Sequence, residues 1–211
     1  MTGGNEARLE RHRPIAIVRL DDLSEAVELG RALVEGGIRA LEFTLTNRDA
    51  VAAVAQVRAD LGEAAVVGAG TVLSADAARE AIAGGAQFLV SPTLEPDVIA
   101  AGREAGVPVV CGAFTPTEIL AAWRHGAELV KVFPVRALGP GYIKDVLAPL
   151  PDLRLVPTGG VDLENCGAFL AAGAYTVALG SNLVDSKLIA NRDWQGLAAL
   201  ARRYVAACKQ Q

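Results

Sequence analysis

The sequence has few cysteines, few histidines and no long apolar run, and each shortage excludes a class of protein. Its 211 residues contain three widely spaced cysteines, Cys111, Cys166 and Cys208, and no CxxC pair. This argues against a disulfide framework and for a reducing compartment. The two histidines, His12 and His125, argue against a histidine-rich metal site. Because no stretch of about 18 uncharged apolar residues occurs, the sequence predicts no transmembrane helix.

The charge balance is also informative about partners and location. The net charge is −4, with acidic and basic residues interspersed. We therefore expect neither a nucleic acid nor an anionic membrane as partner. The polar start "MTGGNEARLERHR" lacks the apolar segment of a signal peptide, so we expect a cytoplasmic protein. Apolar residues make up 52% of the chain, which is typical of a well-packed globular protein.

Short apolar runs alternate with segments of helical spacing along the whole chain. The helical segments include "SEAVELGRALVEGG" and "SADAAREAIAGG". This alternation is typical of βαβ units and a parallel sheet. Strands are predicted over residues 14–20, 40–45, 65–72, 88–92, 108–113, 129–134, 154–159 and 176–181.

Helix boundaries are marked by capping residues and by glycine. Ser24, Ser74 and Thr115 are predicted N-caps, with Pro116 in the first turn of the last of these helices and Glu118 following. Glycine closes a helix because it adopts the left-handed conformation without strain. The predicted helix-ending glycines are Gly37, Gly62, Gly85, Gly106, Gly126 and Gly173.

Eight strands, each followed by a helix, predict a single-domain (β/α)8 TIM barrel. We expect one domain over residues 1–211, with a short N-terminal helix at about residues 4–12. The alternative is a doubly wound sheet, which uses the same units. It is disfavoured because no GxGxxG follows the first strand, and the GxG of "VGAGTV" is interpreted as a bend at a strand end.

Two charged residues stand within apolar strands of the predicted barrel. Glu42 lies in "ALEFTL" and Lys131 in "ELVKVFP". Strands two and six are opposite each other in an eight-stranded barrel, so the two side chains either meet near the axis or point outward under the helices. An interior lysine loses hydration, which favours the neutral amine that forms a Schiff base with a carbonyl. A nearby carboxylate can move protons.

Other polar residues follow the strands on the face where barrel enzymes carry their chemistry. They are Arg19, Thr44, Thr46, Thr71, Ser91, Thr158 and Ser181. "PTGGV" and "LGSNL" follow strands seven and eight, where barrels often bind phosphate through backbone N–H groups. Gly159, Gly160 and Gly180 allow close approach there and Ser181 can donate a hydroxyl, unless these glycines serve only as turns.

Taken together, the motifs resemble those of the class I 2-keto-3-deoxy-phosphosugar aldolases, the 2-keto-3-deoxy-6-phosphogluconate (KDPG) aldolase family. The motifs are "LEFTLTN", "VGAGTVL", "AQFLVSPTLEPDVI", "GAFTPTEI", "LVKVFP", "GPGYIK" and "VPTGGV". The resemblance implies a lyase that cleaves a phosphosugar acid to pyruvate and glyceraldehyde 3-phosphate. It implies no cofactor, because the iminium replaces a metal ion as electron sink. It also implies a homotrimer.

The resemblance assigns a role to each candidate residue. Lys131 matches the Schiff-base lysine, and Glu42 the general acid/base. Thr71 matches a threonine that holds bound pyruvate, Phe133 is expected to pack beside the imine, and Arg19 matches an arginine that some members use on the substrate carboxylate. At the phosphate end, the matching residues are Gly159, Gly160 and Ser181, with Thr158 and Gly180 beside them.

One departure from the family pattern leaves the substrate epimer open, and a second concerns packing. Thr46 stands where members acting on the gluconate substrate carry an arginine, while Arg48 and Arg136 are nearby alternatives. Cys111 replaces a frequent proline and is interpreted as a packing residue. Arg19 either grips the carboxylate or pairs at the rim with Asp21 or Asp22.

Three alternative functions follow from the same residues. One is a 2-keto-3-deoxy-6-phosphogalactonate (KDPGal) or 4-hydroxy-2-oxoglutarate (KHG) aldolase. Another is a different phosphate-binding barrel enzyme, such as an isomerase or epimerase. The last is a non-catalytic phosphosugar-binding protein, which would not require Glu42 and Lys131.

Overall fold

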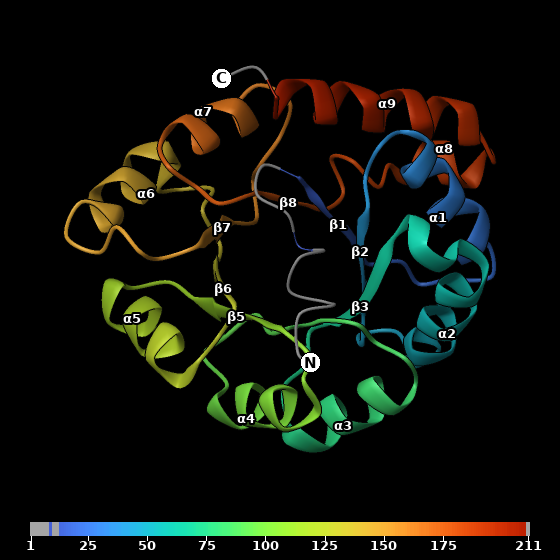
Figure 1. Cartoon of the computed structure of the whole chain (residues 1–211). Helices are drawn as coiled ribbons and strands as arrows, with labels where there is room; N and C mark the ends of the chain where they lie inside the picture. The colour runs from blue at the N-terminus through green and yellow to red at the C-terminus, as the bar shows by residue number, and fades with distance from the viewer. Residues whose placement is uncertain (1–8, 10–12, 210–211) are drawn as a thin grey trace.

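Eight parallel strands alternate with helices around a barrel (Figure 1). The computed structural model describes residue 9 and residues 13–209. The strands are β1 (Ile15–Val18), β2 (Ala40–Thr44), β3 (Val66–Gly70), β4 (Leu89–Val90), β5 (Val109–Ala113), β6 (Leu129–Val132), β7 (Leu155–Pro157) and β8 (Ala178–Leu179). Each lies inside a predicted run, but each is shorter than predicted.

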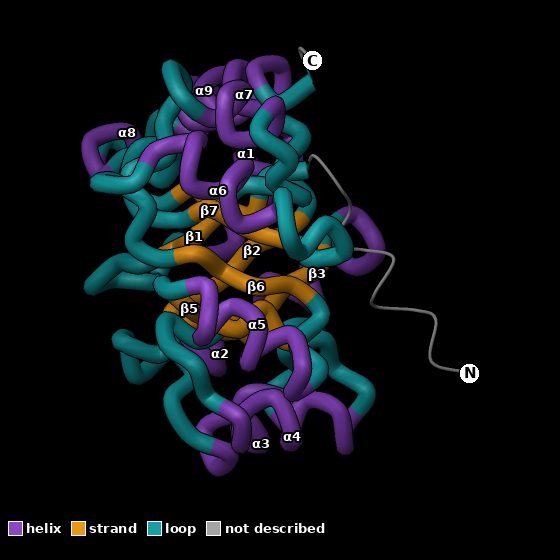
Figure 2. The backbone as a smooth tube through the Cα atoms, turned by 90° about the vertical axis from the view of Figure 1, so that its left-hand side faces the viewer, coloured by secondary structure: helices purple, strands orange, loops and turns teal. Residues whose placement is uncertain are grey.

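The helices surround the strands, as the view turned by 90° shows (Figure 2). They are α1 (Ala26–Glu35), α2 (Ala50–Leu61), α3 (Ala75–Ala83), α4 (Pro96–Ala105), α5 (Pro116–His125), α6 (Gly139–Leu147), α7 (Cys166–Ala171), α8 (Ser186–Ala190) and α9 (Trp194–Ala207), with a 3-10 turn η2 (Gly62–Ala64) after α2. Within the described residues, no helix is long and apolar enough to cross a membrane.

The strand order is that of a (β/α)8 barrel. The strands run β7-β6-β5-β4-β3-β2-β1-β8, so β1 to β7 pair in the order of the sequence and β8 pairs with β1. An isolated parallel bridge between Thr158 and Ala178 closes the remaining seam between β7 and β8. The predicted barrel is confirmed, and the doubly wound alternative is wrong because β1 lies between β2 and β8.

Most predicted helix boundaries are confirmed. Ser74 accepts a hydrogen bond from the N–H of Ala77, and Thr115 forms a capping box with Glu118. All six predicted helix-ending glycines have positive φ, from 52° to 102°. The prediction for Ser24 is wrong. Helix α1 begins at Ala26, and Ser24 lies in the preceding turn, where its own N–H donates to the Asp22 carboxylate.

Two apolar cores position the site. The larger core lies between strands and helices, and it includes Phe43, Leu33 and Ile119. The smaller core fills the barrel interior, and its buried members are Leu9, Ile15, Ala40, Val66, Phe88, Val90, Val110, Leu129, Val156 and Ala178. Of the N-terminal helix expected at about 4–12, only Leu9 is among the described residues, and the rest of that prediction lies outside them.

Candidate active site

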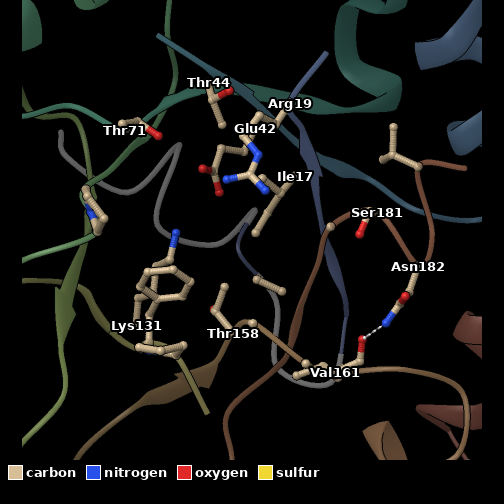
Figure 3. A pocket seen from close by; sticks show the side chains of 18 of the residues that line it. Ile17, Arg19, Glu42, Thr44, Thr71, Lys131, Thr158, Val161, Ser181 and Asn182 are labelled. Carbon is tan, nitrogen blue, oxygen red and sulfur yellow. Dashed lines mark hydrogen bonds between the residues drawn. The ribbon is translucent and has the colours of Figure 1, made fainter. Parts of the chain in front are cut away.

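A cavity of about 490 Å³ opens at the carboxyl ends of the strands. Figure 3 shows side chains from several strands converging on it. The residues that line it include the ten to which the family resemblance gave a place in the site: Lys131, Glu42, Arg19, Thr71, Phe133, Thr158, Gly159, Gly160, Gly180 and Ser181. The barrel therefore brings together residues that are distant in the chain.

Glu42 and Lys131 both lie inside the barrel. Glu42 is 1% exposed and Lys131 is 7% exposed, and the two side chains point toward each other from β2 and β6 (Figure 3). Burial raises the pKa of Glu42, because the carboxylate loses its hydration, while the charge of Lys131 acts in the opposite direction. The buried Oε1 atom of Glu42 has no hydrogen-bond partner within the described chain. The pair thus offers an amine and a carboxyl group that can hold and release a proton.

Glycine makes room for the Glu42 carboxylate. A Cβ atom built on Gly70 would lie 1.9 Å from Oε1 and 2.5 Å from Cδ of Glu42. Likewise, a Cβ atom on Gly68 would lie 2.5 Å from the Phe88 ring. Neither glycine is among the residues with positive φ. Both glycines lie within β3, with Gly70 at its end, and they leave space for Glu42 of β2 and for Phe88, which directly precedes β4. The interpretation of this GxG as a bend stays a prediction.

Phe133 and Thr71 flank the lysine side of the cavity. The Lys131 Nζ atom lies 5.3 Å from the centre of the Phe133 ring. Thr71 directly follows β3 and has a φ of 58°, which is unfavourable for a β-branched residue. Strained backbone of this kind is often found at functional sites.

Arg19 is exposed, and its side chain lines the cavity (Figure 3). Among the described residues, it forms no ion pair with Asp21 or Asp22. Asp22 instead accepts a hydrogen bond from the N–H of Ser24. The alternative in which Arg19 pairs at the rim is therefore absent from this structure.

The glycine-rich loops after β7 and β8 form the opposite side of the cavity. Gly159 and Gly160 have φ values of 82° and 97°, so a residue with a side chain would be strained at either position. Gly180 and Ser181 follow β8. The hydroxyl of Thr158, just before the first glycine pair, donates to the Val156 carbonyl at 3.1 Å.

Asn182 connects these two loops and was not predicted. Its side-chain amide donates to the Val161 carbonyl at 3.0 Å, as Figure 3 shows. Its own carbonyl accepts a 3.2 Å hydrogen bond from the hydroxyl of Tyr204 in α9. The sequence signal for this link between the loops is the asparagine after Ser181 in "LGSNL". Its hydrogen-bond partners could not be predicted, because they come together only in the folded barrel.

Three other polar candidates have structural roles or lie elsewhere. The Ser91 hydroxyl donates to the Thr93 carbonyl and accepts from the Gly112 N–H, and Ser91 does not line the cavity. Cys111 is fully buried beside Ser91, as expected of a packing residue. The Arg48 side chain is 93% exposed and lies near Asp49, outside the cavity.

The end of β2 presents hydroxyl groups to the cavity. Thr44 and Thr46 both line it, and their Oγ1 atoms lie 2.9 Å apart. The Thr44 hydroxyl also faces the Val18 carbonyl at 3.4 Å. The residues at the end of β2 therefore bring no positive charge to the cavity. Arg19, which follows the adjacent strand β1, does bring one.

Comparison with known proteins agrees with this geometry. The family model for KDPG and KHG aldolase matches residues 5–200. A 2-dehydro-3-deoxy-phosphogluconate aldolase of Treponema pallidum is 39% identical, over 92% of this chain and 93% of the relative.

Two solved structures are also similar. One, described as native KDPGal, has a TM-score of 0.84 and 32% identity, and covers 92% of this chain and 95% of its own. The other is a KDPG aldolase from Legionella pneumophila with pyruvate captured as a covalent carbinolamine. Its TM-score is 0.87 at 26% identity, and it covers 96% of this chain and 98% of its own. This chain therefore belongs to the KDPG and KHG aldolase family.

Proposed function

We propose that the protein is a class I aldolase that cleaves 2-keto-3-deoxy-6-phosphogluconate, or a close analogue, to pyruvate and glyceraldehyde 3-phosphate. The observation that carries this proposal is the placement of a buried lysine and a buried glutamate that face each other in one cavity. The carbinolamine in the similar Legionella aldolase supports the same chemistry.

In the proposed reaction, the Lys131 amine attacks the C2 carbonyl and forms a carbinolamine, which loses water to give a protonated imine. Removal of the C4 hydroxyl proton breaks the C3–C4 bond. The electron pair of that bond moves into the imine, which becomes an enamine, and glyceraldehyde 3-phosphate leaves. The enamine takes a proton at C3, and water then releases pyruvate from the lysine.

Glu42 is the proposed proton carrier, acting through a water molecule. Its raised pKa suits this task, because the carboxyl group can hold a proton at a pH where an exposed glutamate could not. Thr71 and Phe133 would enclose the bound pyruvate, and Arg19 would hold its carboxylate. The loops with Gly159, Gly160, Gly180 and Ser181, together with Thr158 at the end of β7, would receive the phosphate.

The KDPGal epimer is the second candidate substrate. Thr46, which stands where gluconate-type members carry an arginine, lines the cavity, and its hydroxyl contacts Thr44. The similarity to the KDPGal structure supports this alternative. A side-by-side assay of pyruvate release from both epimers, their unphosphorylated analogues and KHG would rank the substrates.

The test of the reaction class is reductive trapping. Incubation with pyruvate and borohydride should give one reduced pyruvate adduct, which peptide mapping places on Lys131. A Lys131→Arg variant serves as control and should give none. Another phosphate-binding barrel enzyme, or a protein that only binds sugar phosphates, would give no adduct. An adduct on a different lysine would also overturn the assignment.

Homotrimeric assembly stays a prediction from the family resemblance, and a cytoplasmic location stays a prediction from the polar N-terminus and the free cysteines. Sedimentation equilibrium of the purified protein would test the trimer directly. Cell fractionation would test the location.

A further inference from the structure

A second arginine lines the cavity and has no part in the mechanism above. Arg136 lies in the loop between β6 and α6, five residues after Lys131. From the sequence, Arg136 was predicted only as an alternative to Arg19 for binding the substrate carboxylate. The structure places it at a different part of the cavity.

Arg136 packs directly against the glycine turn after β7. A Cβ atom built on Gly160 would lie 2.8 Å from Cβ, 2.9 Å from Cα and 3.2 Å from Cγ of Arg136. The two loops are also joined through their backbones, since the Val135 N–H donates to the Thr158 carbonyl at 2.9 Å. The base of the arginine side chain is therefore fixed beside the proposed phosphate loops.

The charge of Arg136 is not neutralised by another side chain in the described part of the protein. Six other arginines lie within ion-pair distance of a carboxylate: Arg31, Arg48, Arg79, Arg154, Arg192 and Arg202. No such partner is found for Arg136 among the described residues. Glu42 is the only acidic residue among the described residues that line the cavity, and it faces Lys131 instead.

Gly160, which lies beside Arg136, and Ser181, which lines the same cavity, offer backbone N–H groups to an anion. Among the described residues, the backbone N–H groups of Gly160 and Ser181 donate to no backbone carbonyl in the turns and loops. A guanidinium beside backbone donors is a favourable arrangement for phosphate, because it can donate two parallel hydrogen bonds to adjacent oxygens.

The carbon chain of the substrate decides whether its carboxylate or its phosphate lies closer to Arg136. The carboxylate is bonded to C2, the carbon that Lys131 attacks, so it would lie close to Lys131. Arg19 lines the cavity from the end of β1, which pairs with the strand that carries Glu42. The phosphate is at the far end of the substrate, on C6. Arg136 packs on the glycine turn, so it is placed for the phosphate and Arg19 for the carboxylate.

We propose that Arg136 binds the substrate phosphate and makes the enzyme selective for phosphorylated over unphosphorylated 2-keto-3-deoxy acids. This rests on the proposed aldolase function. It adds to the glycine loops a charged residue that the family motifs did not indicate.

The test compares Arg136→Gln with the parent on a phosphorylated substrate and on its unphosphorylated counterpart. A lost hydrogen bond between charged groups predicts a decrease of about 10- to 100-fold in kcat/KM for the phosphorylated substrate. The value for the unphosphorylated substrate should change by less than about threefold. Inorganic phosphate should also inhibit the variant more weakly than the parent. Arg136→Lys should recover part of the loss, since lysine keeps the charge but not the paired donors.

Arg48→Gln is the matched control, because it removes an arginine that lies outside the cavity, and it should leave both substrates unaffected. Borohydride trapping with pyruvate needs no phosphate and should be unchanged in Arg136→Gln, which shows that the site is intact. If the parent fails to trap pyruvate, the aldolase function fails. If trapping is normal but Arg136→Gln affects both substrates equally, or neither, the phosphate role of Arg136 is refuted.

Discussion

Replacing Gly70 by alanine tests whether the position of the Glu42 carboxylate matters for the reaction. Gly70 lies at the end of β3, paired with Thr44 of β2, in a conformation without positive φ that alanine can adopt. The added methyl carbon would lie 1.9 Å from Oε1 of Glu42 and 2.5 Å from its Cγ and Cδ atoms. The side chain of Glu42 must therefore move.

The size of the movement follows from these distances. Ordinary van der Waals contact begins at 3.4 Å, so a separation of 1.9 Å requires Oε1 to shift by about 1.5 Å if the strand stays in place. A misplacement of about 1 Å in a catalytic group can lower the rate about 100-fold. We therefore expect Gly70→Ala to reduce kcat for pyruvate release by about 100-fold or more, with Lys131 untouched.

Steady-state kinetics and circular dichroism on the same preparations would measure this effect. Gly141→Ala is the control, because a Cβ at Gly141 in α6 would meet no atom within 4 Å apart from its chain neighbours and its own helix backbone, and its kcat should be unchanged. In the Glu42→Gln background, the further loss from Gly70→Ala should be small, since the proton carrier is already gone. A folded Gly70→Ala variant that keeps kcat within about threefold of the parent would refute the reasoning.

Four further substitutions test the remaining assignments. Lys131→Arg should abolish cleavage while leaving the fold intact, because arginine cannot act as a neutral nucleophile near neutral pH. Pyruvate release by a folded variant would refute the assignment of Lys131 as the Schiff-base lysine. Glu42→Gln should lower kcat by about 10²–10⁴-fold, and a loss below about threefold would show that the proton carrier lies elsewhere. The same variant makes a prediction for stability. Burial raises the pKa of Glu42 above its ordinary value of 4.5, so the folded protein retains a proton that the unfolded chain releases, and stability falls as the pH rises past 4.5. The Tm of Glu42→Gln should thus increase relative to the parent between pH 4.5 and pH 7, and a constant difference would contradict the raised pKa. Arg19→Leu should raise KM at least tenfold, about 1.4 kcal/mol, and Thr46→Leu much less; a near-parental KM for Arg19→Leu would assign the carboxylate to another residue.

The barrel could be predicted because its signals are local. Strands buried on both faces appear as continuous apolar runs, and helix ends need glycine whatever surrounds them. Glu42 and Lys131 stood out because a charge within such a run is costly unless it has a function. Their placement on opposite strands then followed from the count of strands.

The remaining features depend on contacts between distant segments. Strands β4 and β8 contain only two residues each. The apolar runs that predicted them are longer, because buried residues continue past the hydrogen-bonded strand into the loops. No local pattern shows that Gly70 leaves space for Glu42, or that Asn182 binds the Val161 carbonyl. Arg136 was noted only as a loop arginine, because its contact with Gly160 exists only once two loops are packed together.

The single bridge between Thr158 and Ala178 has a consequence for the motions of the barrel. Within residues 13–209, β7 and β8 share this one isolated pair and β3 and β4 also share one, whereas β1 and β2 share four pairs and β2 and β3 share five. Segments with few backbone hydrogen bonds open at low free-energy cost. The loops proposed to receive phosphate continue from these two strands, so a bound anion that contacts Gly160 and Ser181 would act as a cross-link over a weakly paired joint of the barrel. Amide hydrogen exchange at this joint should then slow when ligand is added, while exchange between β2 and β3 stays the same.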